Sequence, residues 1–152
     1  MIDIIRLLIF FIGSLFISIY DIKKLQIPLV VMYFILLTGI IVDIIYRRNV
    51  FIFDIVAAAS MCLLFILCRI ITKKGLGLGD VQYSLVCGFY SGLPYFILGS
   101  LISSLAGIIF FLILIFQKKY IQNKKIPFAP FMSLGTVISI IISFKQINLL
   151  SN

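Results

Sequence analysis

The sequence predicts an all-α, polytopic membrane protein with about six transmembrane helices. Of its 152 residues, 63% are hydrophobic and only 12% are charged, whereas roughly a quarter of the residues of soluble domains are charged. The mean hydropathy of +1.28 is correspondingly high. Apolar runs long enough for a bilayer, which takes about 20 residues, recur along the chain. We expect one membrane-embedded domain over residues 1–152, because no polar linker separates these runs.

Six apolar segments are the candidate helices. They cover about residues 4–20, 28–46, 51–71, 81–89, 95–116 and 128–144. Prolines lie at the starts of three segments, where the missing N–H costs little. The first segment lacks a small-residue cleavage site, so we expect a retained helix rather than a signal peptide. In the fifth segment Gly99, Ser103 and Gly107 recur every fourth residue, which favours close helix packing.

The fourth segment is too short to cross a bilayer. Val81 to Gly92 is 12 residues, or about 18 Å of helix, against roughly 30 Å of hydrocarbon. Irregular backbone is tolerated at membrane depth only where it is buried in protein or lines a wet cavity, and the glycine-rich stretch 75–79 suits such a place. We therefore expect Asp80 at the floor of a cavity below the membrane surface.

The basic residues predict the orientation, because Lys and Arg accumulate in short cytoplasmic loops. The first, third and fifth loops hold Lys23, Lys24, Arg69, Lys73, Lys74, Lys118, Lys119, Lys124 and Lys125; the other side holds Arg6, Arg47, Arg48 and Lys145. Both termini are therefore expected outside the cytoplasm, and Asp21 and Asp80 together at its cytoplasmic face. The bases form no continuous face for a phosphate backbone, so nucleic acid is not an expected partner.

The inventory of reactive residues excludes several kinds of site. There is no histidine, which excludes Ser-His and Cys-His nucleophile pairs and His-Glu-x-x-His metal sites. Cys62, Cys68 and Cys87 lie in apolar segments without a C-x-x-C pair, so we expect no metal site and no cofactor. All five acidic residues are aspartates, and a charge in lipid costs at least ~2.5 kcal/mol. Each aspartate therefore needs a partner or a function.

The five aspartates divide into two groups. Asp3, Asp43 and Asp54 lie near Arg6, Arg47 and Arg48 and are interpreted as structural charge pairs. Asp21 and Asp80 also have basic neighbours, so position alone leaves a structural role open for them.

Their context favours a function for Asp21 and Asp80, because both are expected at one end of the bundle. Two adjacent carboxyls share a proton. The neutral one can polarise a scissile carbonyl while the ionised one removes a proton from water, so peptide hydrolysis needs no metal. Gly77 and Gly79 would let a substrate backbone approach and would allow dihedral angles forbidden to other residues.

Three motifs resemble those of bacterial type IV prepilin peptidases, in the same order. Asp-Ile-Lys-Lys-Leu-Gln-Ile-Pro at 21–28 resembles the first motif, an aspartate followed by bases and Ile-Pro-Asn. Gly-Leu-Gly-Asp-Val-Gln at 77–82 resembles Gly-x-Gly-Asp-Val-Lys. Ile-Pro-Phe-Ala-Pro-Phe-Met-Ser-Leu-Gly at 126–135 resembles the late Pro-Phe-Gly-Pro-Phe-x-x-Leu-Gly segment. The departures from these patterns, which bear on substrate specificity, are Leu29, Gln82 and Ala129.

The resemblance implies a GxGD aspartic protease core with Asp21 and Asp80 as the catalytic pair. Such enzymes lie in the inner (cytoplasmic) membrane and cleave the leader of type IV prepilins or pseudopilins after a glycine, at the cytoplasmic face. Larger members carry an N-terminal domain with paired cysteines that is associated with methylation. This chain resembles the short form, so peptidase activity without N-methyltransferase activity is expected.

Two other classes of function remain open from the residues alone. A small ion-coupled transporter would use the same aspartates as coupling sites and the glycine stretch as an unwound helix. A non-catalytic membrane subunit of a pilus or secretion assembly would need neither acid for chemistry. The sequence predicts no oligomeric state.

Overall fold

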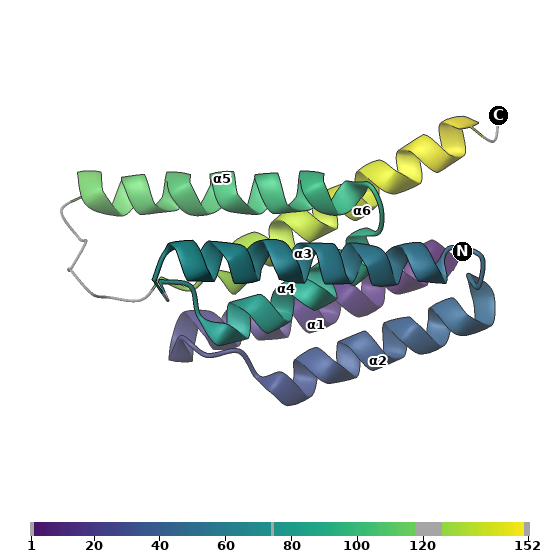
Figure 1. Cartoon of the computed structure of the whole chain (residues 1–152), viewed down its shortest axis with the longest axis horizontal. Helices are drawn as coiled ribbons and strands as arrows, with labels where there is room; N and C mark the ends of the chain where they lie inside the picture. Colours follow the sequence, from purple (N-terminus) through teal and green to yellow (C-terminus); the bar gives the residue numbers. More distant parts are fainter. Residues whose placement is uncertain (1, 74, 118–125, 151–152) are drawn as a thin grey trace.

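The computed structural model describes residues 2–73, 75–117 and 126–150, with side chains as far as residue 145. In these ranges the chain forms α-helices joined by short loops and turns, and no strand. The helices are α1 (Ile2–Lys24), α2 (Leu29–Tyr46), α3 (Phe51–Ile71), α4 (Leu78–Ser91), α5 (Tyr95–Phe116) and α6 (Ala129–Leu150). They run back and forth along one long bundle, so that α1 begins and α6 ends at the same end (Figure 1). The predicted fold class is confirmed.

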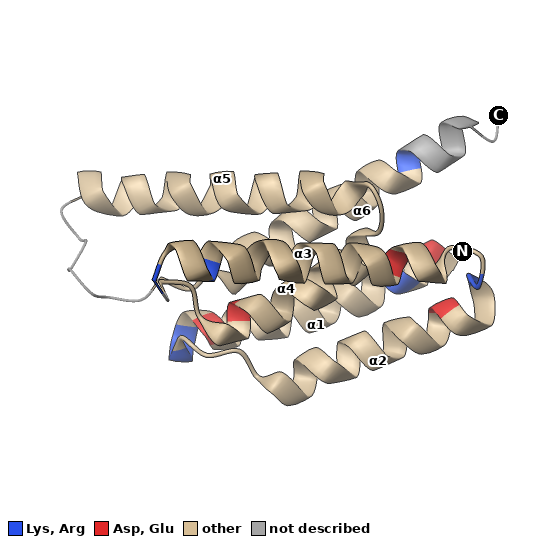
Figure 2. Ribbon diagram, in the orientation of Figure 1, with Lys and Arg blue, Asp and Glu red and all other residues tan. Residues whose placement is uncertain are grey.

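Four helices, α1, α2, α3 and α5, are long and apolar enough to cross a membrane by length and composition. Helical structure is the expected solution there, because every backbone N–H and C=O in lipid must be satisfied within the protein. Charged residues gather toward the two ends of the bundle (Figure 2). Of the bases that predict orientation, Lys74, Lys118, Lys119, Lys124 and Lys125 lie outside the described residues.

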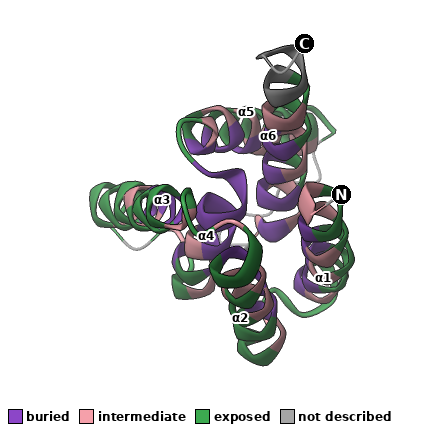
Figure 3. Ribbon diagram, turned by 90° about the vertical axis from the view of Figure 1, so that its right-hand side faces the viewer, coloured by how far each residue is buried: buried purple, intermediate pink, exposed green. Residues whose placement is uncertain are grey.

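Helix α4 is the centre of the bundle. It packs against every other helix, and the end-on view shows it enclosed by neighbours whose outer faces are exposed (Figure 3). Tyr83, Val86 and Phe89 are almost completely buried. At 14 residues, or about 21 Å, α4 is shorter than the roughly 30 Å of hydrocarbon. The predicted short fourth helix is therefore present, and protein rather than lipid surrounds it.

Small residues allow the helices to approach closely. A Cβ atom added to Gly88 of α4 would lie 2.7 Å from the Ala57 carbonyl oxygen of α3. On α6, a Cβ on Gly135 would collide with Gly99 and Ser103 of α5. The stripe predicted in the fifth segment is therefore a packing surface, as is usual for small residues between membrane helices.

The ends of two helices differ from the sequence prediction. Helix α1 continues to Lys24, so Asp21 lies one turn inside the helix rather than at its end. Helix α4 begins at Leu78, so Asp80 lies in its first turn, and the irregular stretch is confined to the residues before Leu78. Both changes place the two acids on regular helix, which holds a side chain more firmly than a loop does.

Candidate active site

Asp21 is held by the start of α6. Its side chain is buried, with the residue only 4% exposed, and its Oδ2 accepts a hydrogen bond of 3.1 Å from the backbone N–H of Ala129. Ala129 is the first residue of α6, where backbone N–H groups have no partner within the helix. The carboxyl of α1 therefore binds a free donor of α6, and the 126–135 motif lies beside Asp21.

Asp80 is held by the loop that precedes its own helix. It is the third residue of α4, and its Oδ2 accepts a hydrogen bond of 3.2 Å from the N–H of Gly77, the N-cap residue. An acidic side chain that reaches back to the N-cap N–H is half of a capping box. This bond fixes the carboxyl close to the glycine loop.

One cavity joins the two acids. It has a volume of about 300 Å³ and is lined by Asp21 and Asp80, by Arg69, by the loop residues 75–77 and the first residue of α4, Leu78, and by Leu25 and Ile126. We call it the aspartate cavity. It brings together the end of α1, the end of α3, the start of α4 and the segment before α6. The expectation that Asp21 and Asp80 share one end of the bundle agrees with this geometry.

The two motif glycines do not adopt the dihedral angles that were expected of them, and their predicted contact with a substrate backbone stays a prediction. Gly77 has φ −66° and ψ 148°, which any residue can adopt, and Gly79 is helical, so neither uses a dihedral angle reserved for glycine. A Cβ on Gly77 would instead lie 2.7 Å from Asp80 Oδ2, and one on Gly79 would lie 3.3 Å from Cβ of Ile27. A side chain at position 77 would therefore displace Asp80, whereas one at position 79 would need only a small shift of Ile27, and the predicted dihedral angles were wrong.

Arg69 is a member of the cavity that the sequence did not single out. It lies in the last turn of α3, and its guanidinium donates a hydrogen bond to the backbone carbonyl of Leu76 in the glycine loop. In the sequence it counts only as one more base at the end of an apolar segment. One feature of the sequence could have identified Arg69. It is a charged residue within the last turn of an apolar helical segment, where a charge is costly.

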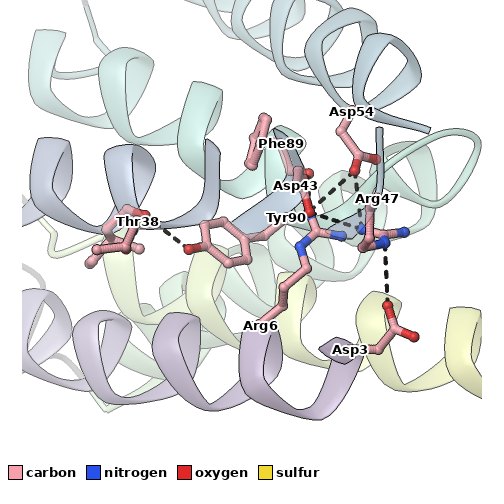
Figure 4. Close-up of polar contacts among 9 residues, drawn as sticks. Asp3, Arg6, Thr38, Asp43, Arg47, Asp54, Phe89 and Tyr90 are labelled. Carbon is pink, nitrogen blue, oxygen red and sulfur yellow. Dashed lines mark hydrogen bonds and ion pairs between the residues drawn. The ribbon is translucent and has the colours of Figure 1, made fainter. Parts of the chain in front are cut away.

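The opposite end of the bundle carries a second group of charges, Asp3, Arg6, Asp43, Arg47 and Asp54, which we call the arginine cluster (Figure 4). Arg6 binds Asp43 at 3.0 Å and Asp54 at 3.3 Å. Arg47 binds Asp3 at 3.4 Å, Asp43 at 3.4 Å and Asp54 at 3.2 Å. The predicted structural pairing is present. The partners differ from simple sequence neighbours, since Arg6 binds Asp43 and Asp54 while Asp3 binds Arg47.

The arginine cluster also borders a cavity, of about 310 Å³, between the start of α1 and the loop from α4 to α5. Its acids are bound directly by guanidinium groups, and Asp43 is completely buried. Asp21 and Asp80 instead accept from backbone N–H groups beside a cavity. Among the described residues no group of three or more possible metal ligands occurs.

Comparison with known protein families identifies the chain. The model of the type IV leader peptidase family matches residues 8–112. The chain belongs to this family. The matched region of this leader peptidase family member includes Asp21, Gly77, Gly79 and Asp80. The motif at 126–135 lies outside the matched region. The resemblance seen in the motifs is thereby confirmed. No curated protein and no solved structure matched the chain.

Proposed function

We propose that this chain is an aspartic endopeptidase that removes the leader of type IV prepilins or pseudopilins by cutting after a glycine. Membership of the leader peptidase family supports a peptidase. The observation that supports the aspartic mechanism is that Asp21 and Asp80, from helices far apart in sequence, line one cavity. The catalytic pair assigned is Asp21 and Asp80, with no cofactor and no metal.

The proposed chemistry uses the two carboxyls as an acid and a base. Neighbouring carboxyls that cannot both ionise share a proton. The protonated one polarises the scissile carbonyl, and the ionised one takes a proton from the attacking water. The backbone N–H groups of Ala129 and Gly77 hold the carboxyls in place, so that their geometry does not depend on the substrate.

The proposed location is the cytoplasmic side of the inner membrane. Lys23 and Lys24 form the last turn of α1 next to Asp21, and Lys73 follows α3 next to the glycine loop. Bases at this end favour the cytoplasm, with both termini on the other side. A substrate with a basic leader would meet the two acids there. We further propose cleavage without methylation of the new N-terminus, as the resemblance to the short form implies.

The proposal is tested with purified protein in proteoliposomes and a prepilin whose product is identified by mass spectrometry. The wild-type chain should release the leader with a single cut after glycine, and Asp21→Asn and Asp80→Asn should not. Asp3→Asn, which alters a partly exposed acid at the other end of the bundle, is the matched control. Wild-type cleavage by either active-site variant would remove the aspartic mechanism, and solute flux without cleavage would favour a transporter.

A further inference from the structure

A single peptide group connects Arg69 with Asp80. The carbonyl of Leu76 accepts the guanidinium of Arg69, and the N–H of Gly77, which belongs to the same peptide unit, donates to Asp80 Oδ2 at 3.2 Å. All of these residues border the aspartate cavity. The peptide group therefore lies between a cation on its oxygen side and a carboxyl on its N–H side.

This connection is rigid because a peptide group is planar. Its carbonyl and N–H cannot rotate independently, so a bond that fixes the direction of the Leu76 oxygen also fixes the direction of the Gly77 N–H. A hydrogen bond from a charged donor is stronger than one between neutral groups. Polarisation along a hydrogen-bonded chain further strengthens the next bond. Arg69 thus orients and strengthens the donor that holds Asp80.

Arg69 and Asp80 lie on two helices, α3 and α4, that pack against each other. Helices α3 and α4 pack closely, with the backbone of Gly88 against Ala57 and Ala58. Arg69 belongs to α3 and Asp80 to α4, whereas Leu76 and Gly77 lie in the connection between these helices. The backbone N–H of Val81 binds the Gly77 carbonyl at 3.3 Å, whereas Arg69 binds the preceding peptide group, whose N–H donates to Asp80.

We propose that Arg69 is a positioning residue that holds the Asp80 carboxyl through the Leu76–Gly77 peptide group. The proposal rests on the proposed catalytic function of Asp80. Arg69 itself need not touch the substrate. Lysine at this place would keep the charge but lose the planar, multiple-donor head group of arginine.

The test compares Arg69→Met, which removes the donor and keeps an unbranched apolar side chain, with Arg69→Lys. Lys73→Met, at an exposed position just after α3, is the matched control. Arg69→Met should lower kcat about 10- to 100-fold, since a misplacement of about 1 Å can cost on the order of 100-fold, and should leave KM within about twofold. Arg69→Lys should recover part of the loss, and Lys73→Met should behave as wild type.

A second measurement does not depend on catalysis. Amide hydrogen exchange of the peptide covering residues 75–80, followed by mass spectrometry, should become faster in Arg69→Met and stay unchanged in Lys73→Met. The proposal requires both results, and unchanged kcat, unchanged exchange, or a rise in KM alone would each overturn it. Full activity of Asp80→Asn would instead reject the proposed function, with the exchange result still deciding whether Arg69 anchors the loop.

Discussion

The two ends of the bundle hold the same kinds of residue in different bonding arrangements. At one end Asp43 and Asp54 are buried and bound directly by Arg6 and Arg47. At the other end Asp21 and Asp80 accept backbone N–H groups and line a cavity with Arg69. The separation is large, since Asp3 and Asp21 are 18 positions apart on α1, or about 27 Å.

This difference separates the acids of the arginine cluster, which are bound by guanidinium groups, from the two acids that we propose to be catalytic. An acid bound by guanidinium on several sides offers little free carboxyl to a substrate. Asp21 and Asp80 border a cavity, which is where water and a peptide would reach them. Acidic residues near a membrane edge are therefore distinguished by what binds them, and changes at the two ends should have different consequences.

The largest effect is expected for Asp21→Asn and Asp80→Asn. Each should lower kcat by about 10²- to 10⁴-fold, the range that general acid–base groups contribute. Stability should hardly change, because the amide oxygen of asparagine can still accept the N–H of Ala129 or Gly77. Initial cleavage rates and thermal unfolding in detergent measure the two quantities. A large loss of stability at either position would erase the contrast between the ends.

Asp43→Asn should lower stability and leave kcat nearly unchanged, the reverse of what is expected for Asp21→Asn and Asp80→Asn. Removal of one partner from a buried ion pair costs about 3–5 kcal/mol, and Asp43 is bound by both Arg6 and Arg47. Unfolding should therefore occur at a lower temperature, while the kcat of the folded fraction stays near that of the wild type. Asp3→Asn is the control, because its side chain is 40% exposed and such pairs contribute about 0–1 kcal/mol. Loss of kcat without loss of stability in Asp43→Asn would contradict this reading of the arginine cluster.

Gly77→Ala should reduce activity by about 10-fold, because the new methyl group would lie 2.7 Å from Asp80 Oδ2 and must displace that carboxyl. The backbone conformation of Gly77 suits alanine, so folding should be retained. Ile71→Ala changes an exposed residue at the end of α3 that does not line the aspartate cavity, and should cleave normally. Equal rates for both variants would show that Asp80 tolerates the displacement.

The smallest expected effect is that of chelation. The aspartate cavity offers two carboxyls and no histidine or cysteine, so EDTA should leave the cleavage rate unchanged. The rate is measured with and without EDTA, and then after addition of Mg²⁺ or Zn²⁺. A rate that falls with EDTA and returns with metal would show that the acids act as ligands rather than as an acid and a base.

Much of the fold could be predicted because lipid restricts the choices. Long apolar runs that cross a membrane form helices. The short apolar run after Gly79 predicted a short fourth helix, which is α4. The predicted positions of the helix ends were less accurate, because the sequence alone allows Asp21 and Asp80 to lie either inside or outside a helix. The true ends depend on partners from elsewhere in the chain, such as Ala129 for Asp21.

In the candidate site, too, some residues could be identified from the sequence and others only from the structure. Its two acids could be named from the motifs, because acids in apolar surroundings are rare and the Gly-x-Gly-Asp pattern is specific. Arg69 could not be assigned to it, because nothing in the sequence indicates that its guanidinium reaches the carbonyl of Leu76. The reason for glycine at position 77 was likewise a contact with a side chain three residues away.

The sequence by itself determined a helical membrane protein, its family motifs and the two candidate acids, because hydrophobicity and residue type are local properties. Only the tertiary structure decided that Asp21 and Asp80 border one cavity, that Arg6 as well as the neighbouring Arg47 binds Asp43, and that the Arg69 guanidinium reaches the Leu76 carbonyl. These are relations between helices. They depend on how side chains and backbone pack in three dimensions, and no local pattern records them.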